Sequence, residues 1–177
     1  MSVSTRLRAT AVALCVAASS FAVAAVPAHA AAQPNACSWY KVGTSAGIWM
    51  NGEYVGEVEQ QYNGCHQARA HWQWSYGYRT QAHPGTTGAW ITVGLYGGVW
   101  AEFPGPQQGS SGSPDAYSPA VYIYYGGEDS WRASASLYTT WTNGSSDDTC
   151  ASYTDEHDYT NGQSTFAAIP GTCSHSF

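Results

Sequence analysis

The dipeptide Asn-Gly occurs four times in this chain, beginning at Asn51, Asn63, Asn143 and Asn161. Both residues of this pair tolerate positive φ, so it favours the tight turns that match the twist of an antiparallel β-hairpin. Runs that alternate apolar and polar residues flank the first two turns, as expected for strands with one buried face. The sequence therefore predicts an all-β fold, an antiparallel meander or β-sandwich built from hairpins.

The first hairpin is predicted around Asn51-Gly52, where a two-residue turn sets Trp49 opposite Tyr54 as an aromatic cross-strand pair. From residue 68 to residue 78, small and aromatic residues occupy the even positions and mostly polar residues the odd ones. This period of two predicts a strand whose even positions face the core.

The register of the second hairpin depends on its loop. A two-residue loop at Asn63-Gly64 would place Glu57 and Glu59 on the aromatic face and bury their carboxylates. A three-residue loop, residues 62–64 with Gly64 left-handed, keeps both on the polar face. We predict this second register, in which Glu57 faces Arg69 as a surface ion pair.

Residues 1–30 have the pattern of an export signal. Arg6 and Arg8 precede a stretch of small apolar residues, and Ala28-His29-Ala30 fits a signal-peptidase site. We expect a Sec-type signal peptide at 1–30 that is cleaved, leaving residues 31–177 as a single secreted, extracellular β domain. No second apolar run is long enough to span a bilayer.

The chain is acidic, with six Lys and Arg against twelve Asp and Glu and a formal net charge of −6. Arg6 and Arg8 lie in the expected signal peptide, so the remaining chain is more acidic still. Nucleic acid and anionic membrane surfaces both require basic groups. We therefore expect neither as a partner, and we expect no cofactor.

Four cysteines follow the expected signal peptide, and an even count in an exported chain predicts two disulfides. Three connectivities are possible; we favour Cys37–Cys65 and Cys150–Cys173, which staple the two ends separately. Zinc is the alternative, but no Cys-x2-Cys pair is present.

A segment rich in Pro, Gly and Ser runs from residue 104 to residue 119. Such composition predicts a long flexible loop rather than a regular element. If this loop were rigid and exposed, residues 105–110 would suit the binding loop of a protease inhibitor.

Residues 54–71 resemble a hairpin of the YjfA-like proteins, small secreted Gram-positive proteins of unknown function. The positions that fit the family pattern are Gly56, Val58, Tyr62, Cys65 and Ala70. Arg69 stands where Trp is usual, and His71 where Arg is usual. The resemblance implies a secreted, disulfide-bonded β fold and brings no catalytic residues.

Two groups of acids are candidates for chemistry. Glu57 and Glu59 share a strand face at a spacing that suits glycoside hydrolysis, and Glu102 is a third candidate. The cluster Asp155, Glu156 and Asp158 offers oxygen ligands for calcium but lacks the spacing of an EF-hand loop. The alternative interpretation is that both groups are solvated surface acids with no catalytic or metal-binding role.

Eight Trp and thirteen Tyr exceed what the core of one small domain needs. We predict that some of these rings are exposed and bind a ligand: Tyr76, Tyr78, Tyr122, Tyr124, Trp131 and Trp141. Exposed flat rings suit a polysaccharide or an extracellular protein partner. The favoured function is thus a secreted binding protein; the alternatives are a glycan hydrolase with paired carboxylates and a protease inhibitor.

Overall fold

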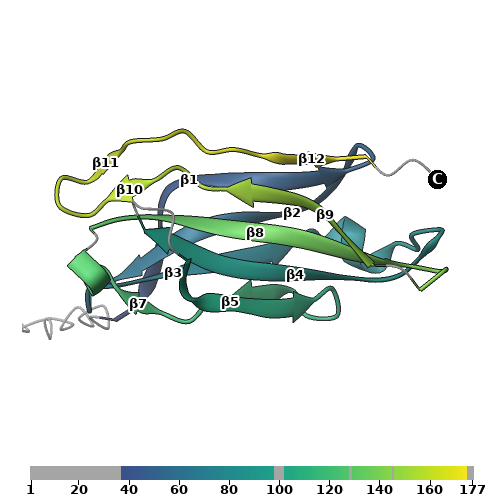
Figure 1. Ribbon diagram of the computed structural model, residues 1–177, viewed down its shortest axis with the longest axis horizontal. Helices are drawn as coiled ribbons and strands as arrows, with labels where there is room; N and C mark the ends of the chain where they lie inside the picture. The colour runs from purple at the N-terminus through teal and green to yellow at the C-terminus, as the bar shows by residue number, and fades with distance from the viewer. Residues whose placement is uncertain (1–36, 98–101, 128, 145, 175–177) are drawn as a thin grey trace, which may run out of the picture. The chain divides into compact units, whose positions relative to one another are not determined.

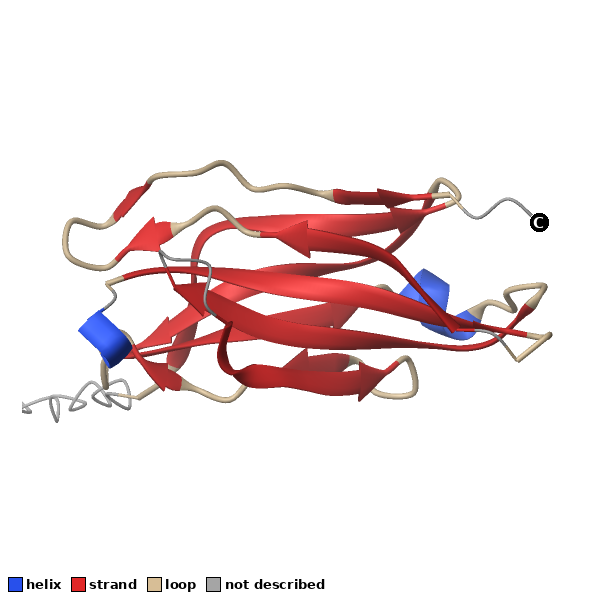
Figure 2. Cartoon of the chain, viewed as in Figure 1, coloured by secondary structure: helices blue, strands red, loops and turns tan. Residues whose placement is uncertain are grey.

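The computed structural model describes residues 37–97, 102–127, 129–144 and 146–174, without the side chains of 102–106 and 146–149. The expected signal peptide lies outside the described residues. Strands make up most of the described part, with one short α-helix, one 3-10 turn and the connecting loops (Figures 1 and 2). The prediction of an all-β fold is confirmed. Within this part of the chain, no helix has the length and apolar character needed to cross a membrane.

The strands form two six-stranded sheets among the described residues. Sheet A has the order β12-β1-β2-β3-β6, with β7 also paired to β3. Its strands are β1 (Trp39–Met50), β2 (Glu53–Asn63), β3 (Gln67–Trp74), β6 (Asp115–Tyr117), β7 (Val121–Tyr122) and β12 (Gly171–Cys173). Neighbours are antiparallel except β1 and β12, which pair in parallel and depart from the predicted antiparallel meander.

Sheet B has the order β11-β10-β8-β4-β5, with β9 also paired to β8. Its strands are β4 (Thr86–Gly97), β5 (Glu102–Ser110), β8 (Ser130–Trp141), β9 (Ser146–Tyr153), β10 (His157–Asp158) and β11 (Gln163–Ser164). All described pairings in this sheet are antiparallel. The helix α1 (Tyr76–Thr80) and the 3-10 turn η1 (Tyr125–Gly127) lie in connections.

One hydrophobic core holds the inner faces of both sheets. The predicted alternation of β3 is confirmed, because Ala68, Ala70, Trp72 and Trp74 are all buried. Sheet B contributes a similar alternating set, in which β-branched and small residues dominate: Ile91, Val93 and Leu95 from β4, with Ala133, Ala135 and Leu137 from β8. Burial of these side chains is the main stabilising contribution to the fold.

Each of the four Asn-Gly dipeptides lies at a connection between consecutive strands: β1–β2, β2–β3, β8–β9 and β10–β11. The first is a two-residue turn in which Asn51 and Gly52 have φ of 51° and 82°. Trp49 pairs with Tyr54 across it, and their rings are 5.2 Å apart. The first hairpin is therefore as predicted.

The predicted register of the second hairpin is wrong, although its assignment of faces is right. Glu59 pairs with His71 and Glu57 with Gln73, so Glu57 does not face Arg69. The loop comprises residues 64–66, because the Asn63 side chain accepts bonds from the backbone N–H groups of Cys65 and Gln67. His66, not Gly64, takes the left-handed conformation, with φ of 59°. An even shift of register leaves each side chain on its predicted face.

The segment 104–119, expected to lack regular structure, contains most of β5 and all of β6. β5 is an edge strand paired only with β4 among the described strands. Its pairing with β4 is regular over residues 107–110 and shifts register between Val93 and Leu95, opposite the Pro-Gly-Pro stretch. Proline is tolerated on an edge strand and at a bulge, since neither position requires its missing N–H group.

Both predicted disulfides are present, Cys37–Cys65 and Cys150–Cys173. The first ties the start of β1 to the β2–β3 turn. The second joins β9 of sheet B to β12 of sheet A. It therefore cross-links the two sheets, whereas we expected a cross-link within one end of the chain.

A buried carboxylate fixes an irregularity in β1. The register between β1 and β2 shifts between Val42 and Ala46, where Gly43 has φ of 66°. Asp155 accepts the backbone N–H of Thr44 at 2.7 Å and also the Ser164 hydroxyl. A side chain at Gly43 would collide with this carboxylate. Asp155 thus holds β1 to the segment between β9 and β10.

We expect Asp155→Ala to lower the free energy of unfolding by about 2–3 kcal/mol, because it removes a buried charged acceptor from the Thr44 N–H group and the Ser164 hydroxyl. Asp155→Asn keeps an acceptor oxygen and should cost less. The measurement is urea unfolding followed by tryptophan fluorescence. Asp129→Ala is the control, since Asp129 accepts only the exposed Thr160 hydroxyl among its side-chain bonds described here. Equal losses for Asp155→Ala and this control would contradict the role of Asp155.

Candidate functional site

The structure divides the six predicted ligand-binding rings into two groups. Trp131, Tyr78 and Trp141 are buried, so they are not the exposed platforms that we predicted. The Trp131 indole donates to the Ile123 carbonyl oxygen at 2.7 Å and belongs to the core. Tyr76, Tyr122 and Tyr124 are exposed.

Tyr122 and Tyr124 belong to a larger group of rings at the end of β2 marked by Asn63. We define the tyrosine surface by five residues: Tyr40, Tyr62, His66, Tyr122 and Tyr124. Ring centroids are 5.5 Å apart for Tyr40 and Tyr62, 5.8 Å for Tyr122 and Tyr124, and 6.3 Å for His66 and Tyr122. Tyr40, Tyr122 and Tyr124 are 52%, 51% and 49% exposed.

Tyr62 lies at the centre of the tyrosine surface. Burial raises its pKa, followed by the proximity of Tyr40, Tyr124 and Tyr122. Its hydroxyl is 3.1 Å from Nδ1 of His66. Its ring also packs on Tyr159 at 5.0 Å, beneath the exposed rings.

The residues that support the tyrosine surface are held by a hydrogen bond and a disulfide. Gln60 donates to the Tyr159 hydroxyl at 2.8 Å, and burial raises the pKa of Tyr159. The Cys37–Cys65 disulfide lies directly beside His66 in the chain and near the start of β1. Rings supported in this way lose little conformational freedom when a ligand binds.

The sequence analysis missed Tyr40, Tyr62 and His66. Their positions carried a signal, because Tyr40 follows Cys37 closely and Tyr62 and His66 flank the Asn63-Gly64 turn. The predicted disulfide brings these two stretches together. The proximity of β7 to them depends on its pairing with β3, where Gln67 faces Tyr122.

Tyr76 is the most exposed aromatic residue described, at 79%, but it lies outside the tyrosine surface. It begins α1, whose N-cap is Ser75. This helix follows Trp74, which pairs with Gly56 near the opposite end of β2 from Tyr62.

The predicted catalytic carboxylates do not form a facing pair, because other side chains engage them. Glu59 accepts from Gln61 at 2.7 Å and lies 2.8 Å from Nδ1 of His71. Glu57 contacts the Ser45 hydroxyl at 3.4 Å. Burial, followed by the nearby Glu57 carboxylate, raises the pKa of Tyr54 to about 12. The backbone of Glu102 is in β5, and its side chain lies outside the described residues.

His71 has a carboxylate on each side. Its Nε2 lies 2.8 Å from Asp115 on β6, and its Nδ1 lies 2.8 Å from Glu59 on β2. Carboxylate oxygens accept, so this geometry suits an imidazolium that donates from both nitrogens. A ring engaged on both sides is a structural link between three strands rather than a free general base.

Four flat groups stack along the outer face of sheet A. The Arg69 guanidinium lies 4.2 Å from the ring centroids of both Trp39 and Tyr117. Tyr117 in turn stacks on His71, at 4.4 Å and an angle of 5°. Arg69 also donates to Gln61 at 2.9 Å. This stack accounts for Arg69, His71 and Tyr117 without invoking a ligand.

The acidic cluster near the end of the chain is used within the fold. Asp155 and Glu156 are buried, and Glu156 accepts from Thr165 at 3.2 Å. Asp158 accepts the backbone N–H of Thr160 at 2.7 Å and closes the β10–β11 turn. Among the described residues, no three His, Cys, Asp or Glu side chains gather as a metal site would require.

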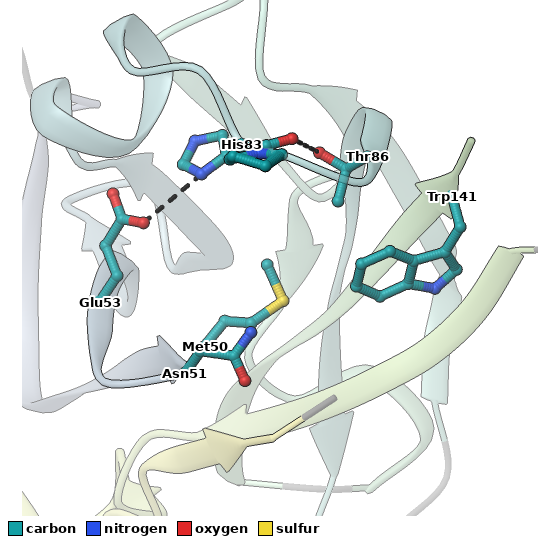
Figure 3. Close-up of a pocket in the computed structure, with 7 residues that line it drawn as sticks. Met50, Asn51, Glu53, His83, Thr86 and Trp141 are labelled. Carbon is teal, nitrogen blue, oxygen red and sulfur yellow. Dashed lines mark hydrogen bonds and ion pairs between the residues drawn. The ribbon is translucent and has the colours of Figure 1, made fainter. Parts of the chain in front are cut away.

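A cavity of about 310 Å³ lies at the Glu53 end of β2 (Figure 3). The residues that line it are Met50, Asn51, Glu53, His83, Pro84, Thr86 and Trp141. Nδ1 of His83 is 3.4 Å from Glu53, and Nε2 is 2.6 Å from the Tyr78 carbonyl oxygen. Trp141 is therefore placed at a cavity wall, although it is buried.

Tyr78 packs against His83, one of the residues that line this cavity. Its ring stacks on His83 at 4.0 Å, and on Trp74 at 5.9 Å. Burial, followed by the nearby Glu53 carboxylate, raises the pKa of Tyr78 to about 12. Its hydroxyl is buried with no hydrogen-bond partner among the described residues.

Comparison of the chain with family models, curated proteins and solved structures finds no match. The resemblance to the YjfA-like proteins stays a prediction.

We expect His71→Ala to lower the free energy of unfolding by about 3 kcal/mol, because it leaves two carboxylates without their shared partner. Urea unfolding measures this loss. In a Glu59→Gln background the same substitution should cost less, since only Asp115 then loses an ionic partner. An unchanged cost in that background would contradict the coupling of His71 to Glu59.

The Tyr78 hydroxyl predicts a dependence of stability on alkaline pH. A folded-state pKa of about 12, above the ordinary 10.0, contributes stability that is present below about pH 10 and is lost as the pH rises toward 12. Tyr78→Phe removes this dependence and deletes an unpartnered hydroxyl. We expect equal or slightly higher stability than wild type at about pH 8, and clearly higher stability at about pH 11. Equal losses between these two pH values in both proteins would contradict the assignment.

Proposed function

We propose that this chain is a secreted β-sandwich protein that binds a neutral polysaccharide through the tyrosine surface. The observation that carries the proposal is the presence of three half-exposed rings, Tyr40, Tyr122 and Tyr124, around Tyr62. Isolated exposed rings are ordinary on protein surfaces, but a fixed group of them is a typical binding feature.

The chemistry of a pyranose fits such a surface. One face of the sugar ring presents C–H groups, which pack against aromatic rings, while hydroxyls project from the rim. The tyrosine hydroxyls and His66 supply donors and acceptors beside the apolar ring faces. A protein partner would also use tyrosine anchors, so it is an outcome that the test below must separate.

Charge favours an uncharged polymer. The formal net charge of −6 repels anionic polysaccharides at low ionic strength. The nearest basic side chain in sequence, Lys41, donates to Ser45 at 2.7 Å. Chitin, cellulose and xylan are therefore better candidates than acidic glycans.

Secretion is supported by two observations. The two disulfides suit an oxidising compartment, and residues 1–30 have the pattern of an export signal.

Hydrolysis is less well supported than binding. Glu59 is engaged by His71 and Gln61, and no facing pair of free carboxylates accompanies the tyrosine surface in the described residues. Protease inhibition is also less well supported, because residues 105–110 belong to β5 and pair with β4 from residue 107 onward.

The test is co-sedimentation of the purified protein with chitin, cellulose, xylan and peptidoglycan, with soluble sugar assayed in the supernatant. We expect depletion from the supernatant by at least one polymer without sugar release. The double variant Tyr122→Ala/Tyr124→Ala should lose about tenfold or more in affinity, because each ring contributes about 1–2 kcal/mol at such a site.

Tyr76→Ala is the matched control, because it removes a more exposed tyrosine outside the tyrosine surface. It should bind as wild type does. Equal losses in Tyr76→Ala and the double variant, or no depletion by any polymer, would contradict the proposal and favour a protein partner. Sugar release would favour a hydrolase.

A further inference from the structure

The cavity at the Glu53 end of β2 places the Glu53 carboxylate next to Nδ1 of His83. Nε2 of His83 is 2.6 Å from the Tyr78 carbonyl oxygen, and a carbonyl oxygen only accepts. Nε2 therefore carries a proton, and in the neutral ring Nδ1 presents a lone pair. This lone pair faces Oε2 of Glu53 at 3.4 Å.

Protonation of His83 would satisfy only part of this arrangement. It would pair Nδ1 with Oε2 of Glu53 and leave Oε1 as it is. Oε1 is buried and has no hydrogen-bond partner among the described residues. Glu53 thus keeps acceptor capacity that its contact with His83 does not meet, while its side chain is 36% exposed.

The other side of the cavity is apolar. Met50, Pro84 and the Trp141 indole form this wall, and Figure 3 shows Trp141 across the cavity from the facing pair of Glu53 and His83. No Lys or Arg is among the residues that line the cavity. The cavity thus combines a carboxylate that no Lys or Arg of the lining neutralises with an aromatic wall.

We propose that this cavity binds a primary ammonium ion carried by a compact apolar group. The ammonium donates to Glu53 and to Nδ1 of His83, and the apolar group packs on Trp141 and Met50. An ammonium has three hydrogen-bond donors and a full positive charge. It therefore complements a carboxylate and a ring nitrogen that both accept hydrogen bonds. The indole adds a cation–π attraction, and the acidic chain attracts cations.

This site is separate from the tyrosine surface. Glu53 is the first residue of β2, whereas Tyr62 is next to its last. Binding of an ammonium at the cavity therefore does not require the proposed polysaccharide function, and each proposal fails or holds independently.

The test is isothermal titration calorimetry of the purified protein with benzylammonium and with benzyl alcohol, its neutral counterpart. We expect benzylammonium to bind about tenfold or more tightly than benzyl alcohol, and Glu53→Gln to abolish this preference. The double variant Tyr122→Ala/Tyr124→Ala should bind benzylammonium as wild type does.

Two further variants keep the test decisive. Asp129→Asn removes the same unit of charge at a residue that does not line the cavity, and it should leave the preference unchanged. Asn51→Asp adds a carboxylate at the cavity, in a turn conformation that Asp also adopts, and it should tighten benzylammonium binding alone. Equal binding of the two probes to wild type, or equal effects of Glu53→Gln and Asp129→Asn, would overturn the proposal. If Glu53→Gln does not fold, Asn51→Asp decides: tighter binding of benzylammonium alone supports the proposal, and unchanged binding overturns it.

Discussion

The alternation of β3 between its two faces is the constraint on which both the core and the outer face of sheet A depend. Ala68, Ala70, Trp72 and Trp74 fill the inner face, so the intervening residues must point outward. Arg69 and His71 then have no core to enter and find partners on neighbouring strands instead. One period-of-two pattern therefore produces an apolar interior and, on the other side, a compact set of stacked and ion-paired groups.

The elements predictable from the sequence were those fixed by neighbours in the chain. The Asn51-Gly52 turn and the inner face of β3 belong to this class. The two disulfides were predicted on other grounds, from the even number of cysteines and their positions near the two ends of the expected domain. The register of β2 against β3 was not predictable, because it depends on the Asn63 side chain capping the turn. The strands β5 and β6 were missed because Pro and Gly usually indicate a loop, and only the three-dimensional sheet shows that β5 lies at an edge.

Side-chain surroundings were the least predictable feature. Counting rings indicated that some would be exposed but did not distinguish Trp131, which fills the core, from Tyr122, which lies at the surface. The tyrosine surface joins the consecutive elements β1, β2 and the β2–β3 turn to β7 and Tyr124, which lie far along the chain. The cavity likewise joins the β1–β2 turn, the stretch after α1 and the end of β8. Such convergence depends on tertiary pairing, which local patterns do not encode.

The parallel pairing of β1 with β12 has a consequence for the order in which the fold is completed. Residues 48–50 pair with residues 171–173, so β1 finds its outer neighbour only in a segment that is synthesised much later. Until then the β1 edge presents unpaired backbone groups, which are a template for association with another chain. Long-range pairings of this kind form slowly. The β1 edge of the nascent protein thus stays open until β12 has been made, and the docking of β12 closes that edge.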